Sequence, residues 1–223
     1  PQLAKLFMET QNNVFGDYGS GQMYATDQWN EISPSSYDHA YLQSYGKAVY
    51  DAMNDFDNES VWVMQAWFLV SIALCEQGQT GACQNGWLQE NNASSSVPYP
   101  RAAAYLSGIP KGRLLILDLE ANNYPVYKYT NNFYGHDWIW TCIHNFGQKP
   151  GIYGNLTSYI SGPLEAMKSS AANFNGIGLA PEGINQNHVV YELASEMAWH
   201  NTTIDLAEWI SNFVRSRYNG SVE

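Results

Sequence analysis

Basic residues are scarce in this sequence. Its 223 residues include 10 lysines and arginines against 21 aspartates and glutamates, which gives a formal net charge of −11 at pH 7. No cluster of basic residues interrupts the acidic background, so the chain offers no path for phosphate groups and no nucleic-acid partner is expected. An acidic surface is compatible with work at low pH, where partial protonation of carboxylates brings the net charge nearer zero.

Long hydrophobic runs are also absent. The most apolar stretch, residues 61–74, contains Gln65 and is shorter than the roughly 18 residues that a membrane-spanning helix needs, so no membrane span is predicted. Residues 1–10 lack the order of features that defines a signal peptide. We therefore expect any export signal to have been removed or to lie upstream.

Only three cysteines occur, and neither Cys-x-x-Cys nor His-Glu-x-x-His is present, so no metal site is predicted. Cys75 and Cys83 flank a short polar loop that a local disulfide would pin. Cys142 lies among large apolar residues, which is typical of a buried unpaired thiol. Secretion is further supported by five Asn-x-Ser/Thr glycosylation motifs, which predict a lysosomal or secreted glycoprotein; they begin at Asn58, Asn92, Asn155, Asn201 and Asn219.

Short runs rich in β-branched and aromatic residues alternate with helical or irregular stretches. The predicted strands lie near residues 22–30, 61–68, 113–119, 137–144 and 176–181. Such alternation favours an α/β fold with a parallel sheet and helices outside it. The spacing of the strands is typical of a (β/α)8 barrel of about 250 residues, of which five units fill only part.

The helical stretches show amphipathic spacing. We expect a helix within residues 36–56, with Tyr37, Tyr41, Tyr45, Ala48 and Ala52 on one face, and another within residues 161–174. A third, within residues 187–200, places Val190, Leu193, Ala194 and Met197 on one side. Residues 71–100 are interpreted as a surface insertion in a barrel domain spanning residues 1–204, and a new helix is expected in residues 205–223.

Polar and aromatic residues stand where the predicted strands end. In a (β/α)8 barrel the carboxyl ends of the strands meet on one face, where the chemistry of such enzymes occurs. In strand order, these residues are Asn30 and Glu31, Trp67, Asp118 and Glu120, His144 and Asn145, and Glu182.

Two glutamates at separate strand ends indicate glycoside hydrolysis. One carboxylic acid protonates the departing oxygen while a second, ionised one attacks the anomeric carbon or activates water, so their environments must differ. Glu31 precedes the partly apolar segment 32–34 and is assigned as general acid/base. Glu182 lies between Pro181 and Gly183, which shape the turn beside it, and is assigned as nucleophile. Trp67 is the best candidate for an aromatic platform under a sugar ring.

Other interpretations of the same residues remain open. A glutamate at a strand end can cap a loop or join an ion pair, Trp67 can be a core residue, and His144 can be hydrogen-bonded inside the barrel. Asp118 and Glu120 form a rival carboxylate pair, although carboxylates so close together more commonly bind water, an arginine or a metal.

Several long segments, in order, resemble the α-N-acetylglucosaminidase family, glycoside hydrolase family 89. They read YATDQWNEISP, VWVMQAWF, GRLLILDL, WIWTCIHNFG, GLAPEGINQNHVVYELASEMAW and DLAEWISNFVRSRY. The resemblance implies an exo-acting, retaining hydrolase, without a cofactor, that removes terminal α-linked N-acetylglucosamine from glycans such as heparan sulfate. It implies Glu31 as acid/base, Glu182 as nucleophile and Trp67 in the sugar pocket, with Asn30, His144 and Asn145 in matching motifs that contact substrate.

Members of that family are much longer than this chain. The resemblance implies about the last five βα units of the barrel, followed by the start of a helical domain at residues 205–223. The implied partners are the glycan, the N-terminal half of the barrel, the C-terminal helical domain and, in a homo-oligomer, further copies of the chain. Two other functions are compatible with the same barrel: a non-catalytic glycan-binding or structural subunit, and a retaining hydrolase for a different sugar.

Overall fold

The computed structural model describes residues 2–16, 23–29, 31–91, 96–148, 151, 153–170 and 172–219. Its described part contains one parallel sheet with the strand order β1-β2-β3-β4-β5. The strands are β1 (Met23–Ala25), β2 (Val61–Gln65), β3 (Leu114–Asp118), β4 (Asp137–Cys142) and β5 (Phe174–Leu179). Each starts within two residues of a predicted start, but β1 ends at Ala25, well before the predicted end at residue 30. The parallel βα units confirm the predicted α/β fold.

Successive strands pair in register, with Met23 opposite Val61 and Trp62 opposite Leu114. Since all five strands run the same way, their carboxyl ends lie along one edge of the sheet, as the strand-end prediction requires. The pairing of β4 with β5 shifts between Trp138 and Trp140, and Ala180 extends it by donating its N–H to the Cys142 carbonyl (2.9 Å).

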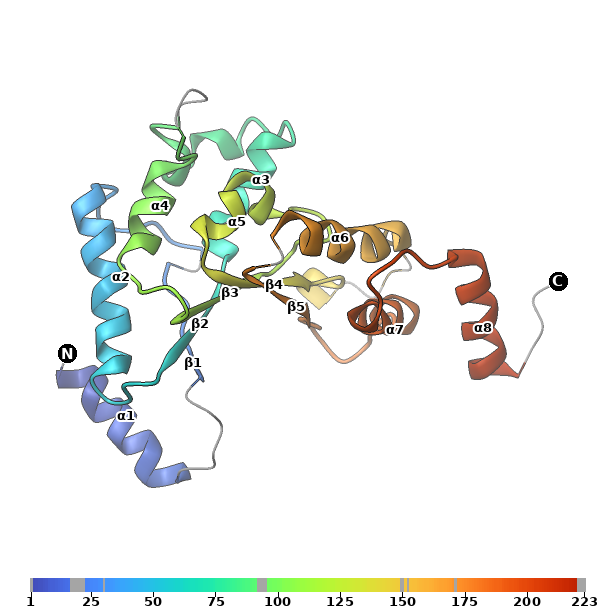
Figure 1. Ribbon diagram of the computed structural model, residues 1–223, viewed down its shortest axis with the longest axis horizontal. Helices are drawn as coiled ribbons and strands as arrows, with labels where there is room; N and C mark the ends of the chain where they lie inside the picture. Colours follow the sequence, from blue (N-terminus) through green and yellow to red (C-terminus); the bar gives the residue numbers. More distant parts are fainter. Residues whose placement is uncertain are drawn as a thin grey trace.

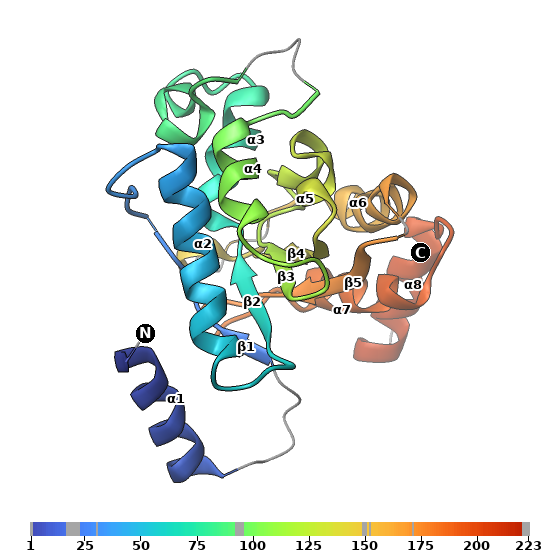
Figure 2. The same cartoon turned by 60° about the vertical axis from the view of Figure 1, so that its left-hand side comes forward.

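Helices α2 to α6 lie on one side of the curved sheet, with α1 at one end of the molecule and α8 at the other (Figures 1 and 2). No helix in the described ranges is long and apolar enough to cross a membrane. The α-helices are α1 (Gln2–Phe15), α2 (His39–Asn54), α3 (Val70–Glu76), α4 (Pro100–Ser107), α5 (Asn131–Tyr134), α6 (Leu156–Ser169), α7 (His188–Glu196) and α8 (Leu206–Tyr218). The 3-10 helices are η1 (Trp67–Leu69), η2 (Ala82–Gln84), η3 (Gly86–Leu88), η4 (Val126–Tyr129), η5 (Phe146–Gln148) and η6 (Met197–Trp199).

The buried face of α2 differs from the predicted one. Its buried residues are Leu42, Gly46, Tyr50 and Met53. The predicted face included Tyr41, Tyr45 and Ala52, each one position before a buried residue. Close packing against α4 explains the shift, because a Cβ at Gly46 would lie 2.6 Å from the carbonyl oxygen of Tyr105. On α7, by contrast, the predicted residues Val190, Leu193 and Ala194 are all buried, as is Met197, which follows in η6.

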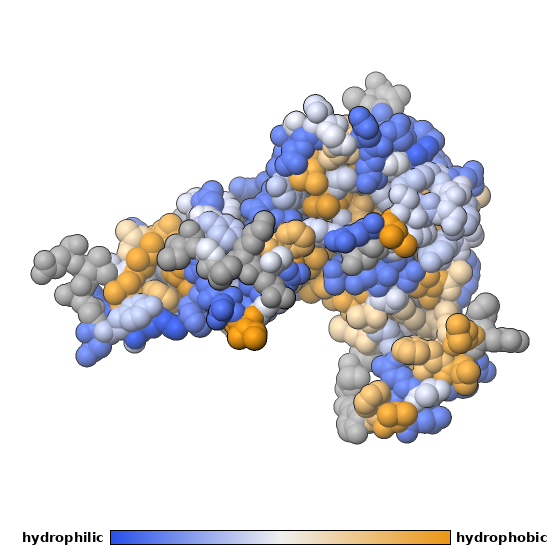
Figure 3. Space-filling view, turned by 180° about the vertical axis from the view of Figure 1, so that it is seen from behind, coloured by the Kyte–Doolittle hydropathy of each residue, from blue (hydrophilic) through white to orange (hydrophobic). Residues whose placement is uncertain are grey.

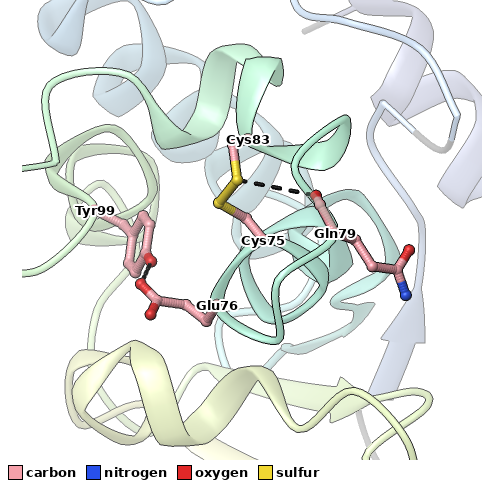
Figure 4. The surroundings of a disulfide bond; sticks show 5 residues. All are labelled: Cys75, Glu76, Gln79, Cys83 and Tyr99. Carbon is pink, nitrogen blue, oxygen red and sulfur yellow. Dashed lines mark hydrogen bonds between the residues drawn. A yellow bond between two sulfur atoms is a disulfide. The ribbon is translucent and has the colours of Figure 1, made fainter.

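The segment 71–100, interpreted as a surface insertion, contributes to the core as well as to the surface. Ile72 in α3 is completely buried, and the buried ring of Trp87 lies 5.0 Å from Phe68 and 5.5 Å from Trp29, between ring centroids. The predicted disulfide joins Cys75 to Cys83 (Figure 4). Tyr99 then ties the end of the segment back to α3 by donating its hydroxyl hydrogen to the Glu76 carboxylate (Figure 4).

One end of the sheet carries a large apolar surface. Among the described residues, strand β1 pairs with β2 alone. A groove of about 950 Å³ runs between β1, α1 and α2, lined by residues that include Phe7, Tyr45 and Val49. Apolar side chains also gather on the outer face of α1, at the lower right of Figure 3. Those exposed on α1 are Leu3, Leu6, Phe7, Val14 and Phe15. A patch of this extent marks an interaction surface.

Candidate active site

Glu182 lies three residues beyond β5, in a turn that is held against the segment following β4. Its backbone N–H donates to Oδ1 of Asn145 (3.2 Å), and Nδ2 of Asn145 donates to its backbone carbonyl. The backbone N–H of Gly147 donates to its carboxylate Oε2 (2.6 Å). An N–H that donates to an ionised carboxylate forms a strong, short hydrogen bond, so this contact fixes the direction of the side chain.

Asn145 is 2% exposed, and both of its polar atoms contact protein. Besides its two bonds to Glu182, its Oδ1 accepts a hydrogen bond from the hydroxyl of Tyr191 in α7 (2.6 Å). Burial raises the pKa of Tyr191 to about 12, so the hydroxyl keeps its proton. The sequence predicted that Asn145 contacts substrate; in the structure its amide contacts the turn that carries Glu182.

His144 is 4% exposed and is enclosed by side chains of neighbouring elements. Its Nε2 lies 3.2 Å from Nδ2 of Asn187, and its Nδ1 lies 3.0 Å from the hydroxyl of Tyr159. Because the Asn187 amide can only donate from Nδ2, the bonding assigns the proton of the neutral ring to Nδ1. Burial lowers the pKa of His144, which favours that neutral form. The ring also stacks on Tyr153, with centroids 4.6 Å apart.

Glu31 occupies the other end of the candidate site, beyond the short strand β1. Its φ of 59° is in the left-handed region, which is uncommon for a residue with a side chain and is a feature that clusters at functional sites. Glu31 is exposed and lines a pocket of about 210 Å³ together with Trp67 and with Asn85 and Trp87, which follow the disulfide-closed loop. Asn30, also predicted to contact substrate, lies outside the described residues.

Trp67 connects the surroundings of the two glutamates. It begins η1, directly beyond β2, and it lines the pocket that contains Glu31. Its ring also lies 5.1 Å from that of Phe146, which directly precedes Gly147, the residue bound to the Glu182 carboxylate. Phe146 is 41% exposed and was not predicted as a site residue. The one signal for it was its position immediately after two polar strand-end residues.

Asp118 and Glu120, the alternative carboxylate pair, both accept hydrogen bonds from other protein groups. Asp118 is 1% exposed, and its two oxygens accept hydrogen bonds from the backbone N–H groups of Val126 (3.3 Å) and Tyr127 (3.1 Å), which begin η4. Burial raises its pKa to about 7 although these two bonds favour the ionised form. Glu120 accepts a hydrogen bond from Nδ2 of Asn123 (2.9 Å), and burial raises its pKa too. Asp118 therefore anchors a loop.

The remaining predicted features have separate places in the fold. Cys142 is buried and unpaired, and burial raises the pKa of its thiol to about 12. Among the residues described, no group of three His, Cys, Asp or Glu side chains is arranged to hold a metal ion. Asn92 lies outside the described ranges, while the other glycosylation motifs present exposed asparagines at Asn58, Asn155, Asn201 and Asn219.

Comparison with known proteins adds independent information. The family model of the alpha-N-acetylglucosaminidase TIM-barrel domain matches residues 1–82 and 82–201. Human alpha-N-acetylglucosaminidase is 35% identical over 222 residues, which are 99% of this chain and 27% of the human protein. A family 89 glycoside hydrolase from Clostridium perfringens, solved with PUGNAc, matches with a TM-score of 0.76 and 25% identity. That match covers 100% of this chain and 21% of the bacterial one, and the values are the same for its complex with 2-acetamido-1,2-dideoxynojirmycin.

The match to the barrel model confirms that the five βα units are part of a (β/α)8 barrel. The chain spans about a quarter of the length of the relatives it matches.

Proposed function

Because the chain belongs to the α-N-acetylglucosaminidase family, we propose that it carries the two catalytic glutamates of a retaining glycoside hydrolase. The substrate is a glycan with a terminal α-linked N-acetylglucosamine, such as heparan sulfate. The observation that carries the proposal is the position of Trp67, whose contacts reach both the Glu31 pocket and the segment that binds Glu182.

The proposed reaction is a double displacement. Glu182 attacks the anomeric carbon while Glu31 protonates the departing oxygen, and Glu31 then removes a proton from the water that releases the sugar. Oε2 of Glu182 accepts the Gly147 N–H, so Oε1 is the oxygen that we assign to the attack. The exposed carboxyl of Glu31 can reach both the leaving group and incoming water.

The apolar surface at β1 supports the proposed partner, the N-terminal half of the barrel. A strand laid beside the open edge of β1 would complete its backbone hydrogen bonds, and the same unit would cover the exposed face of α1. At the other end, α8 stacks Trp209 on Phe213 and donates from Trp209 Nε1 to Glu196 Oε2 (2.5 Å). We assign it to the start of the helical domain. The disulfide and the exposed glycosylation motifs support a lysosomal or secreted location.

Turnover of an aryl α-N-acetylglucosaminide by the complete enzyme tests the proposal. We expect Glu182→Ala to lower kcat by about 10³-fold or more, since loss of a nucleophile removes the covalent route. Glu31→Ala should impair substrates with poor leaving groups most, because an activated aryl group needs little protonation. Glu165→Ala, which removes an exposed carboxylate on α6, is the control and should change neither kcat nor its dependence on the leaving group. Full activity in both active-site variants would rule out the assignment.

A further inference from the structure

We propose that Tyr191, acting through Asn145, is a positioning residue that sets the orientation of Glu182. The inference rests on the proposed role of Glu182 as nucleophile. In the described part of the structure, no contact joins Tyr191 to the Glu182 carboxylate or to the pocket beside Glu31. Its influence is therefore exerted through the side-chain amide of Asn145.

The side-chain amide of Asn145 forms hydrogen bonds with both backbone polar groups of Glu182. Its Oδ1 accepts the N–H of Glu182 at 3.2 Å, and its Nδ2 donates to the carbonyl of Glu182. Two bonds to one residue limit rotation about both of its backbone dihedrals. Nε2 of Gln186 also binds this turn, donating to the carbonyls of Glu182 (3.0 Å) and Gly183 (2.7 Å), and Asn145 adds the bond to the Glu182 N–H.

The backbone of Glu182 selects which way round that amide lies, and Tyr191 restrains it there. A flipped Asn145 would point its NH2 group at the Glu182 N–H, and donor would face donor. The Tyr191 hydroxyl donates to Oδ1 at 2.6 Å and so restrains the amide in the orientation that the Glu182 backbone selects. The chain of contacts joins α7, the segment after β4 and the turn after β5, three parts of the chain that folding alone brings together.

The position of the carboxylate depends on both ends of this arrangement. The backbone N–H of Gly147, in the same segment as Asn145, donates to Oε2 of Glu182 at 2.6 Å. A shift of the turn relative to this segment would lengthen that hydrogen bond. Reaction rates respond steeply to such shifts, because a displacement of about 1 Å can cost about 100-fold. Tyr191→Phe should therefore lower kcat by about 10- to 100-fold and leave KM within about twofold, since no atom that binds the ground-state sugar is removed.

A matched control exists on α2. The hydroxyl of Tyr50 donates to Oδ1 of Asn54 at 2.9 Å, so Tyr50→Phe deletes the same kind of part-buried hydrogen bond at another place. Both variants keep the aromatic ring and should shift the unfolding midpoint of the full-length enzyme by similar small amounts. Only Tyr191→Phe should lower kcat for an aryl α-N-acetylglucosaminide.

A double variant tests the route of the effect. If Tyr191 acts through Asn145, Tyr191→Phe should add less than twofold to the kcat loss of Asn145→Ala, whereas independent effects would multiply. Wild-type kcat in Tyr191→Phe, an equal loss in Tyr50→Phe, or a raised KM with unchanged kcat would each overturn the inference. Failure of the underlying function is a different result, namely undiminished turnover by Glu182→Ala.

Discussion

Asp118 should make the protein more stable in acid than at neutral pH. Its carboxyl is 1% exposed, and burial raises its pKa from 3.8 to about 7. Between these two values the folded protein keeps the proton while the unfolded chain has lost it. Stability falls with rising pH wherever the folded state binds more protons, so the loss occurs from about pH 4 to pH 7.

The size of the effect follows from the two pKa values. One pKa unit corresponds to about 1.36 kcal/mol, and the difference of 7 − 3.8 gives a loss of about 4 kcal/mol across the window. Burial of the whole side chain means that solvent does not screen this contribution. Such a dependence suits a protein that works in an acidic compartment.

Replacement by asparagine isolates the contribution of this carboxyl. Asp118→Asn cannot titrate, so its unfolding free energy should lack the decline of about 4 kcal/mol, although at pH 4 it is less stable because its NH2 group faces a backbone N–H. Chemical or thermal unfolding of both proteins at pH 4, 5, 6 and 7 measures the difference. Parallel profiles for the two proteins would refute the reasoning.

Three further predictions concern the site and its supports. Gly147→Ala should lower kcat and cost about 1–2 kcal/mol of stability, because φ is 69° there and its N–H binds Glu182; unchanged kinetics and unfolding would contradict this. Reduction of Cys75–Cys83 should destabilise the folded state by about 2.5 kcal/mol, the entropy of closing so short a loop, and calorimetry with and without reductant checks it. Trp67→Ala should raise KM about 10-fold with little change in kcat, the signature of lost sugar stacking; an unchanged KM would place Trp67 outside the sugar site.

The sequence predicted the strands well because each is a short apolar run bounded by polar residues. It did less well on α2, whose buried face depends on close contact with α4. A Cβ on Gly108 at the end of α4 would lie 2.2 Å from the carbonyl of Gln43, so the two backbones touch. No hydrophobic pattern within α2 reports such a contact, which depends on a helix more than 40 residues away.

In the candidate site, too, the sequence predicted local positions but not long-range contacts. His144, Asn145 and Glu182 lie just beyond β4 and β5, as the strand-end prediction required, whereas Glu31 lies well beyond the end of β1 at Ala25. The sequence could not show that the polar atoms of Asn145 bind the Glu182 backbone, because that contact joins residues 37 apart. Gly147 was missed for a similar reason, since a backbone N–H donor leaves no mark on residue type.

The covalent intermediate gives the most direct test that Glu182 is the nucleophile and Glu31 the acid/base. In a Glu31→Ala enzyme given an activated aryl α-N-acetylglucosaminide, the glycosyl-enzyme should form readily and break down slowly, since no base activates water. Mass spectrometry of the digested protein should then find one N-acetylglucosamine residue on the peptide that contains Glu182. A sugar attached to a different carboxylate, or product release without any adduct and without slowing, would contradict the account.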